Sequence, residues 1–156
     1  MMELREMMAR HARNGRVDWI GVRPGRREDM RVVEGAEIDA AGLAGDHGRP
    51  GKRAVTLVQA EHLGVIGALL GREAVDPALL RRNIVVSGLN LLALKGRRVV
   101  VGSAVLEVWG PCPPCSRMEE VLGRGGYSAV RGHGGVYASV VAPGAVLAGE
   151  AVWPEG

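Results

Sequence analysis

The amino-acid sequence predicts a β-rich α+β domain, in which a barrel or barrel-like sheet carries a few short peripheral helices. Three observations lead to this prediction: many short apolar runs bounded by turns, few and short helical patterns, and no alternation of strands and helices. The chain has 156 residues, including 24 glycines, and 47% of its residues are hydrophobic. This length and composition suffice for one core, so we expect a single domain over residues 1–156.

The first half of the chain is predicted to contain two helices and three strands. Residues 1–14 are expected to form an N-terminal helix, because Leu4, Met7 and Met8 fall on one helical face. The long segment 40–52 is expected to be a loop, and a loop of this length in a compact domain is usually functional or flexible. A second helix is expected to begin at residue 59 or 60 and to end at residue 70. The predicted strands span residues 17–22, residues 30–38 with an interruption at Gly35, and residues 54–58.

The second half is predicted to be mostly strands. Asp76 and Pro77 have the residue types of an N-cap and a first helical position, so a short helical turn is expected up to Leu80. Ser116 and Glu119 have the spacing of a capping box, which predicts a helix after the second cysteine. The predicted strands span residues 84–86, a hairpin of 97–101 with 104–109, residues 136–141 and residues 145–152, the last interrupted at Gly149.

Composition and charge exclude several classes of protein. The net charge is +3 and aromatic residues make up only 3% of the chain, so we expect no nucleic-acid partner. No segment matches a phosphate-binding loop of nucleotide hydrolases. No apolar run is as long as a membrane span, and the N-terminus lacks a signal-peptide core. Two cysteines cannot form a disulfide framework, so we expect a cytoplasmic protein with reduced thiols and no membrane partner.

Both cysteines lie in one proline-rich segment, Gly110 to Glu120. Cys115 directly precedes the predicted helix, where the helix dipole and free N–H groups favour a thiolate. The spacing of Cys112 and Cys115 allows a redox pair, half of a zinc site completed by His47 and His133, or a single nucleophile at Cys115. Two inert cysteines in a turn are the fourth interpretation.

Three further segments carry groups that can bind anions. Nearly all cations of the chain are arginines, which grip phosphates and carboxylates in a bidentate way, although a GC-rich genome produces the same bias. The glycine-rich loop that carries residues 46–49 together with Lys52 and Arg53 is either an oxyanion or phosphate site or a solvated loop. The segment 81–83 either grips a phosphate or faces water. The turn 132–135 is either a backbone nest for an anion or a hairpin turn.

These segments, in this order, resemble the MOSC domain, which is named after the C-terminal domain of molybdenum cofactor sulfurases. The resemblance covers residues 17–152, nearly the whole chain. It depends on Gly45-Asp46-His47-Gly48, Arg82-Asn83-Ile84, Pro114-Cys115-Ser116-Arg117, Gly134-Gly135-Val136-Tyr137 and Gly149-Glu150-Ala151-Val152.

The resemblance implies a β-barrel-like fold, an association with the molybdenum cofactor and an essential cysteine at Cys115. That cysteine would carry sulfur as a persulfide or ligate molybdenum, and Cys112 would be auxiliary. The expected partners are a cysteine desulfurase, a molybdoenzyme or electron-transfer proteins, and a related activity is the reduction of N-hydroxylated compounds. Pyridoxal phosphate belongs to another domain of the full sulfurases, which nothing in this chain resembles. The residues expected to bind the cofactor are His47, Arg49, Arg82, Asn83, Arg117, His133, Gly134 and Gly135.

Two alternatives from other functional classes stay open at the level of the sequence. One is a non-catalytic zinc- or anion-binding module. The other is a thiol–disulfide oxidoreductase that uses Cys112 and Cys115 as its redox pair, although the usual strand–helix–strand context of such enzymes is missing. The sequence predicts neither the oligomeric state nor the substrate.

Overall fold

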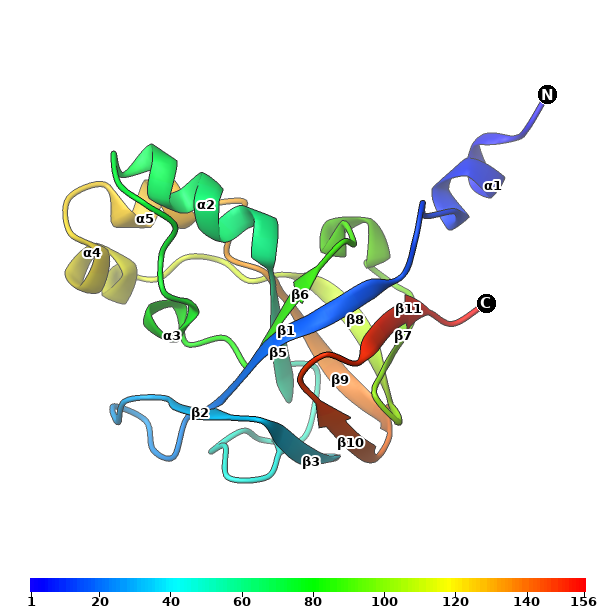
Figure 1. The fold of residues 1–156 in the computed structure, drawn as a ribbon, viewed down its shortest axis with the longest axis horizontal. Coiled ribbons are helices and arrows are strands. Elements are labelled where there is room, and N and C mark those ends of the chain that lie inside the picture. Colours follow the sequence, from blue (N-terminus) through cyan, green and yellow to red (C-terminus); the bar gives the residue numbers. More distant parts are fainter.

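A computed structural model describes all residues, 1–156, and a closed β-barrel dominates it (Figure 1). Eight strands form one sheet in the order β11-β7-β8-β9-β5-β6-β1-β2, and a further pairing between β11 and β1 closes all of them except β2 into the barrel. The predicted barrel-like, β-rich fold is therefore confirmed. The barrel strands are β1 Gly15–Val22, β5 Val55–Gln59, β6 Ile84–Ser87, β7 Arg98–Val101, β8 Ala104–Pro111, β9 Val136–Ala142 and β11 Ala151–Pro154.

The strands are antiparallel except for β5 and β6, which run parallel because helices connect them. Side chains alternate between the two faces of the barrel wall. Leu57 and Ile84 point into the interior, where 22 buried residues form the main core. Their neighbours Val58 and Val85 point outward into a second core of nine buried residues. This alternation places a layer of helices outside β5 and β6.

The helical layer consists of α2 Ala60–Leu69, α3 Pro77–Leu80, α4 Ser116–Leu122 and α5 Gly126–Val130. These helices gather at one side of the barrel (Figure 1). The 3-10 helix η1 Leu91–Leu94 lies between β6 and β7. The helix α1 Leu4–Ala9 is shorter than the segment 1–14 suggested, buries no residue and stands away from the barrel (Figure 1). No helix combines the length and the apolar composition that a membrane crossing requires.

A second, three-stranded sheet corrects one sequence prediction and accounts for two predicted interruptions. It contains β10 Gly144–Leu147, β3 Gly35–Asp39 and β4 Gly42–Leu43 in that order, and β4 lies within the predicted loop 40–52. The predicted strand 30–38 is two strands, β2 Arg31–Val33 and β3. The predicted strand 145–152 is also divided, because Gly149 has a φ of +95° and reverses the chain between β10 in the small sheet and β11 in the barrel.

A cationic pocket beside the cysteine segment

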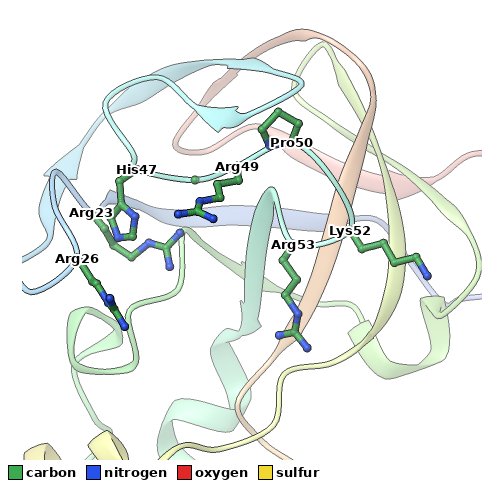
Figure 2. Close-up of a pocket in the computed structure, with 8 residues that line it drawn as sticks. Arg23, Arg26, His47, Arg49, Pro50, Lys52 and Arg53 are labelled. Carbon is green, nitrogen blue, oxygen red and sulfur yellow. The ribbon is translucent and has the colours of Figure 1, made fainter.

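The largest cavity of the molecule, about 1010 Å³, is lined almost wholly by basic residues. It lies on the outside of the barrel, where the loop after β1 meets the segment before β5. Figure 2 shows His47, Arg23 and Arg49 gathered on one side of it, while Lys52 points away from them. The residues that line the cavity are Arg23, Arg26, His47, Gly48, Arg49, Pro50, Lys52 and Arg53. No carboxylate belongs to this lining and six of its eight residues are Arg, Lys or His, so the cavity favours an anion.

One of these cations, Arg23, is held by a buried carboxylate. The backbone N–H of Arg23 donates to Asp46 Oδ1 at 2.7 Å, and its side-chain Nε and Nη2 donate to the two oxygens at 3.0 and 2.9 Å. The Asp46 side chain is fully buried and that of Arg23 is 19% exposed. This bidentate pair fixes the loop after β1 against the loop before β5.

Asp46 keeps its negative charge despite this burial. Desolvation by itself would raise the pKa of the carboxyl. The hydrogen bonds from Arg23, the charge of Arg23 and a hydrogen bond from Asn83 act in the opposite direction, and they hold the pKa below its ordinary value. The carboxylate is therefore a permanent part of the loop structure near neutral pH.

Asn83 is a buried residue whose side chain holds Asp46 in place. All of its side-chain hydrogen-bonding groups are used within the protein, so none is free for a ligand. Its Nδ2 donates to Gly21 O at 3.1 Å and to Asp46 Oδ1 at 3.2 Å, and its Oδ1 accepts from the backbone N–H and the hydroxyl of Thr56 at 3.1 and 3.2 Å. The residue is fully buried. In this structure Asn83 positions Asp46 and leaves no side-chain group free for the predicted direct contact with an anion.

The remaining cations of the cavity have no ion-pair partner. Arg26, Arg49, Lys52 and Arg53 take part in none of the ion pairs of the structure, which are Arg16–Asp18, Arg23–Asp46 and Arg98–Glu107. Two of the four rest on aromatic rings.

The aromatic contacts involve Lys52 and Arg53. The Lys52 Nζ lies 4.6 Å from the centre of the Trp109 ring, and the Arg53 guanidinium lies 4.3 Å from the centre of the Tyr137 ring. Neither cation is paired with a carboxylate, so their hydrogen-bond donors are available for an anion.

Arg81 and Arg82 are neighbours in the chain but point to different parts of the site. Arg81 ends α3 with a φ of +57°, the only positive φ among residues other than glycine. Its guanidinium donates to the backbone oxygens of Glu28 at 2.6 Å and Gly25 at 3.1 Å, which holds the loop that carries Arg26. Arg82 Nε donates to Gly134 O at 2.6 Å.

The turn before β9 connects Arg82 to the cysteine segment. Gly134 O accepts from Arg82, and Gly135 O accepts from the backbone N–H of Cys112 at 2.8 Å. Gly135 has a φ of +97°, and a Cβ there would collide with Leu57 O. The turn joins helix α5 to strand β9, so the interpretation as a hairpin turn is wrong. Neither glycine lines the cavity.

The two cysteines differ in exposure. Cys112 is buried with 6% exposure, whereas Cys115 is exposed, and both are free thiols. Burial raises the pKa of the Cys112 thiol, and the charges of Arg82, Arg53 and Arg23 reduce this rise only in part. Cys112 is thus a protonated thiol at neutral pH, which argues against a symmetric redox pair.

Cys115 occupies the N-cap position of α4, directly before Ser116. The predicted capping box does not form, because no side chain caps this helix. The Glu119 carboxylate turns instead to the next helix, where it accepts from the backbone N–H groups of Gly125 and Tyr127 at 3.0 Å each. The helix start predicted at Ser116 is confirmed, but the capping box from which it was predicted is absent.

Neither cysteine lines the large cavity. Arg53 is the residue that links the cavity to the cysteine segment. Arg53 lines the cavity and its charge acts on the Cys112 thiol. In Figure 2 its side chain points toward the segment that follows β8. Cys112 therefore lies near two cations of the cavity, Arg53 and Arg23, although no residue of the cysteine segment lines the cavity itself.

The predicted zinc site is not assembled. His133 lies against His62 with ring centres 5.2 Å apart, and its Nδ1 is 3.2 Å from Ala129 O. His47 lies in the cationic cavity with its backbone N–H bonded to Arg23 O. No group of three His, Cys, Asp or Glu side chains is placed to hold a metal ion. The structure therefore does not bring Cys112, Cys115, His47 and His133 together as zinc ligands.

Of the eight residues predicted to bind a cofactor, only His47 and Arg49 line the large cavity. Arg117 lines a separate, smaller cavity together with Arg81. The sequence-based prediction named Lys52 and Arg53 as cations of an anion-binding loop but omitted Arg23 and Arg26. The signal for these two was the charged segment 23–29.

Comparisons with known proteins agree on one family. The model of the MOSC domain family matches residues 8–153. The YuaD protein from Bacillus subtilis superimposes with a TM-score of 0.79 at 20% identity, over 90% of this chain and 94% of that one. None of the curated protein sequences matches the chain significantly.

Two proteins named YiiM share the fold as well. The protein from Geobacillus stearothermophilus gives a TM-score of 0.75 at 20% identity, over 91% of this chain and 75% of that one. The protein from Escherichia coli gives a TM-score of 0.73 at 23% identity, over 93% of this chain and 71% of that one.

Proposed function

Because this chain belongs to the MOSC domain family, we propose that it serves molybdenum cofactor chemistry, with Cys115 as its reactive residue and the cationic cavity as its anion site. MOSC domains are associated with molybdenum cofactor proteins. The observation that carries the proposal is the cluster of unpaired cations, Arg26, Arg49, Lys52 and Arg53. One of them, Arg53, acts on the Cys112 thiol, and the same segment carries the exposed thiol of Cys115.

The donor set of the cavity fits the anionic part of a phosphate-bearing pterin. Arginine offers paired N–H donors to phosphate oxygens, and charge-assisted hydrogen bonds are about twice as strong as neutral ones. Arg49 and Arg53 would hold the phosphate, while the Arg23–Asp46 pair keeps their loop in place. His47, on the same cavity wall, would add a further donor.

The exposed thiol of Cys115 fits two tasks. As a sulfur carrier, its thiolate attacks the outer sulfur of a persulfide on a cysteine desulfurase. A new S–S bond forms on Cys115, the donor's S–S bond breaks, and the donor leaves as a thiolate, so no external oxidant is needed. As a ligand, the same thiolate would hold molybdenum, which when bound supplies two-electron redox chemistry.

Reduction of an N-hydroxylated compound is the activity that would use the second task. Conversion of an N–OH group to N–H and water consumes two electrons and two protons. The chain contains no redox pair of its own, because Cys112 is buried and its pKa is raised. An electron-transfer protein would therefore have to supply the electrons.

Cofactor content tests the cavity. The chain, produced under molybdenum-replete conditions, is expected to co-purify with molybdenum and pterin in equal amounts. Arg49→Gln combined with Arg53→Gln should lower this content several-fold, since each removes a charge-assisted contact. Arg5→Gln on α1, far from the cavity, is the matched control. Absence of molybdenum and pterin from the unaltered protein, also after reconstitution, would overturn the cofactor proposal.

Mass spectrometry separates the two tasks of Cys115. A sulfur carrier incubated with a cysteine desulfurase and cysteine should gain one sulfur atom on Cys115, and Cys115→Ser should gain none. Cys112→Ser should still be loaded. A thiol–disulfide oxidoreductase would instead lose activity equally in both variants, and a non-catalytic anion-binding module would retain its ligand in Cys115→Ser.

A further inference from the structure

We propose that a second pocket, between α3, α4 and the segment before β2, binds a small monocarboxylate with an apolar body. The cavity measures about 330 Å³, which suits a small ligand. Its polar groups are Arg81, Arg117 and Asp29, and its apolar groups are Met30, Ala78, Leu79 and Val121. None of these residues lines the large cationic cavity, so the proposal does not depend on the function proposed above.

The first observation is an orphaned donor. The Nε of Arg117 is the only buried side-chain nitrogen or oxygen of the structure without a hydrogen-bond partner. Buried polar groups in proteins are almost always hydrogen-bonded, and a group of a charged side chain is especially costly to leave unpaired. Since Arg117 lines this cavity, a carboxylate bound there would pair with its guanidinium, whose Nε has no partner in the protein.

The second observation is the charge balance. Arg81 is fixed by its hydrogen bonds to Glu28 O and Gly25 O, and neither Arg81 nor Arg117 takes part in an ion pair. Asp29 contributes one negative charge to the lining, so two guanidinium groups and one carboxylate leave a net charge of +1. This balance favours a monoanion over a phosphate dianion, which Asp29 would repel.

The third observation is the apolar wall opposite the charges. Leu79 on α3 and Val121 on α4 are 40% and 36% exposed, although both are apolar and face the same cavity. A ligand with an aliphatic or aromatic body would cover them, and its carboxylate would reach Arg117. A purely inorganic anion would leave this wall uncovered, so the geometry points to an amphipathic acid.

Hexanoate and its neutral analogue hexanamide are suitable probes, because they differ in charge but hardly in shape. We expect calorimetric or NMR titration to show binding of hexanoate, with hexanamide and acetate binding at least about 10-fold more weakly. Arg117→Gln should weaken hexanoate binding about 10-fold. Arg5→Gln on α1, which lines neither cavity, should leave hexanoate binding unchanged.

A second variant keeps the test valid if Arg117→Gln fails to fold. Val121→Ala shortens an exposed side chain of the apolar wall, and it should weaken hexanoate roughly threefold while leaving the weak binding of acetate unchanged. The proposal is overturned if hexanoate does not bind, if hexanamide binds equally well, or if neither variant changes the affinity. Loss of cofactor binding with retained hexanoate binding would instead refute only the function proposed above.

Discussion

Two sets of cations meet in one cavity and differ in their partners. Arg23 is bound to the buried carboxylate of Asp46, which Asn83 in turn orients. Arg26, Arg49, Lys52 and Arg53 have no carboxylate partner. Arginine therefore stabilises the loop structure in the first set and is available to a ligand in the second. What distinguishes a structural arginine from a ligand-binding one in this cavity is whether a carboxylate is paired with it.

The largest effect is expected from removing the acid of the paired set. Asp46→Ala leaves Arg23, which is 19% exposed, without its partner and should lower the free energy of unfolding by about 3 kcal/mol. Urea denaturation followed by circular dichroism would measure the change. The matched control is Asp18→Ala, whose partner Arg16 is 65% exposed, and there we expect about 0.5 kcal/mol. Equal losses in the two variants would contradict the distinction.

A smaller loss is expected from the amide that orients the acid. Asn83→Ala leaves the buried hydroxyl of Thr56 and the oxygen of Gly21 with fewer partners, and should cost about 2 kcal/mol of unfolding free energy. Asn90→Ala is the control, because Asn90 is exposed and its side chain makes no cap hydrogen bond. If Asn83 instead bound a ligand directly, the variant would lose affinity and keep its stability.

Lowering the pH should reduce the stabilisation that the Arg23–Asp46 pair contributes. The pKa of Asp46 in the folded protein lies below the ordinary 3.8, so its contribution to stability is fully present above that pH and is lost as the pH falls through the lower folded value. The stability difference between the wild type and Asp46→Asn should therefore be constant from pH 7 to about 5 and shrink below about pH 4. Denaturation series at these pH values test this. A difference that grows on acidification would show that the carboxylate pKa is raised.

The barrel could be predicted from the sequence because its signals are local. Short apolar runs and turn residues place the strands within a few positions of those observed, and the helix starts at Pro77 and Ser116 follow from nearby residues. The interruption of the last strand at Gly149 was predicted, but its two halves lie in different sheets, and that could not be predicted because pairing with distant strands decides it. β10 joins β3 from a distant part of the chain, whereas β11 joins β7 and β1.

The candidate site was less predictable for the same reason. The cationic segments 46–53 and 81–83 stand out in the sequence. Neighbouring residues do not indicate, however, that Asn83 is buried or that Asp46 pairs with Arg23, which is 23 positions away. Arg117 follows Cys115 closely in the chain, yet it lines a cavity with Arg81 rather than the large one. Long-range packing decides which of these polar side chains remain free.

The smallest effect on stability, and the sharpest contrast, is expected in the unpaired set. Arg49→Gln removes an exposed cation without a carboxylate partner, so the free energy of unfolding should change by less than about 0.5 kcal/mol. The same variant should bind inorganic phosphate roughly fivefold more weakly, because one unit charge near an anion contributes about 1 kcal/mol in water. Calorimetric titration at low and high salt measures this, and the difference between variant and wild type should diminish at high salt as screening increases. If Arg49→Gln destabilised the protein as much as Asp46→Ala, or left phosphate affinity unchanged, the unpaired cations would be structural as well, and pairing would no longer distinguish the two sets.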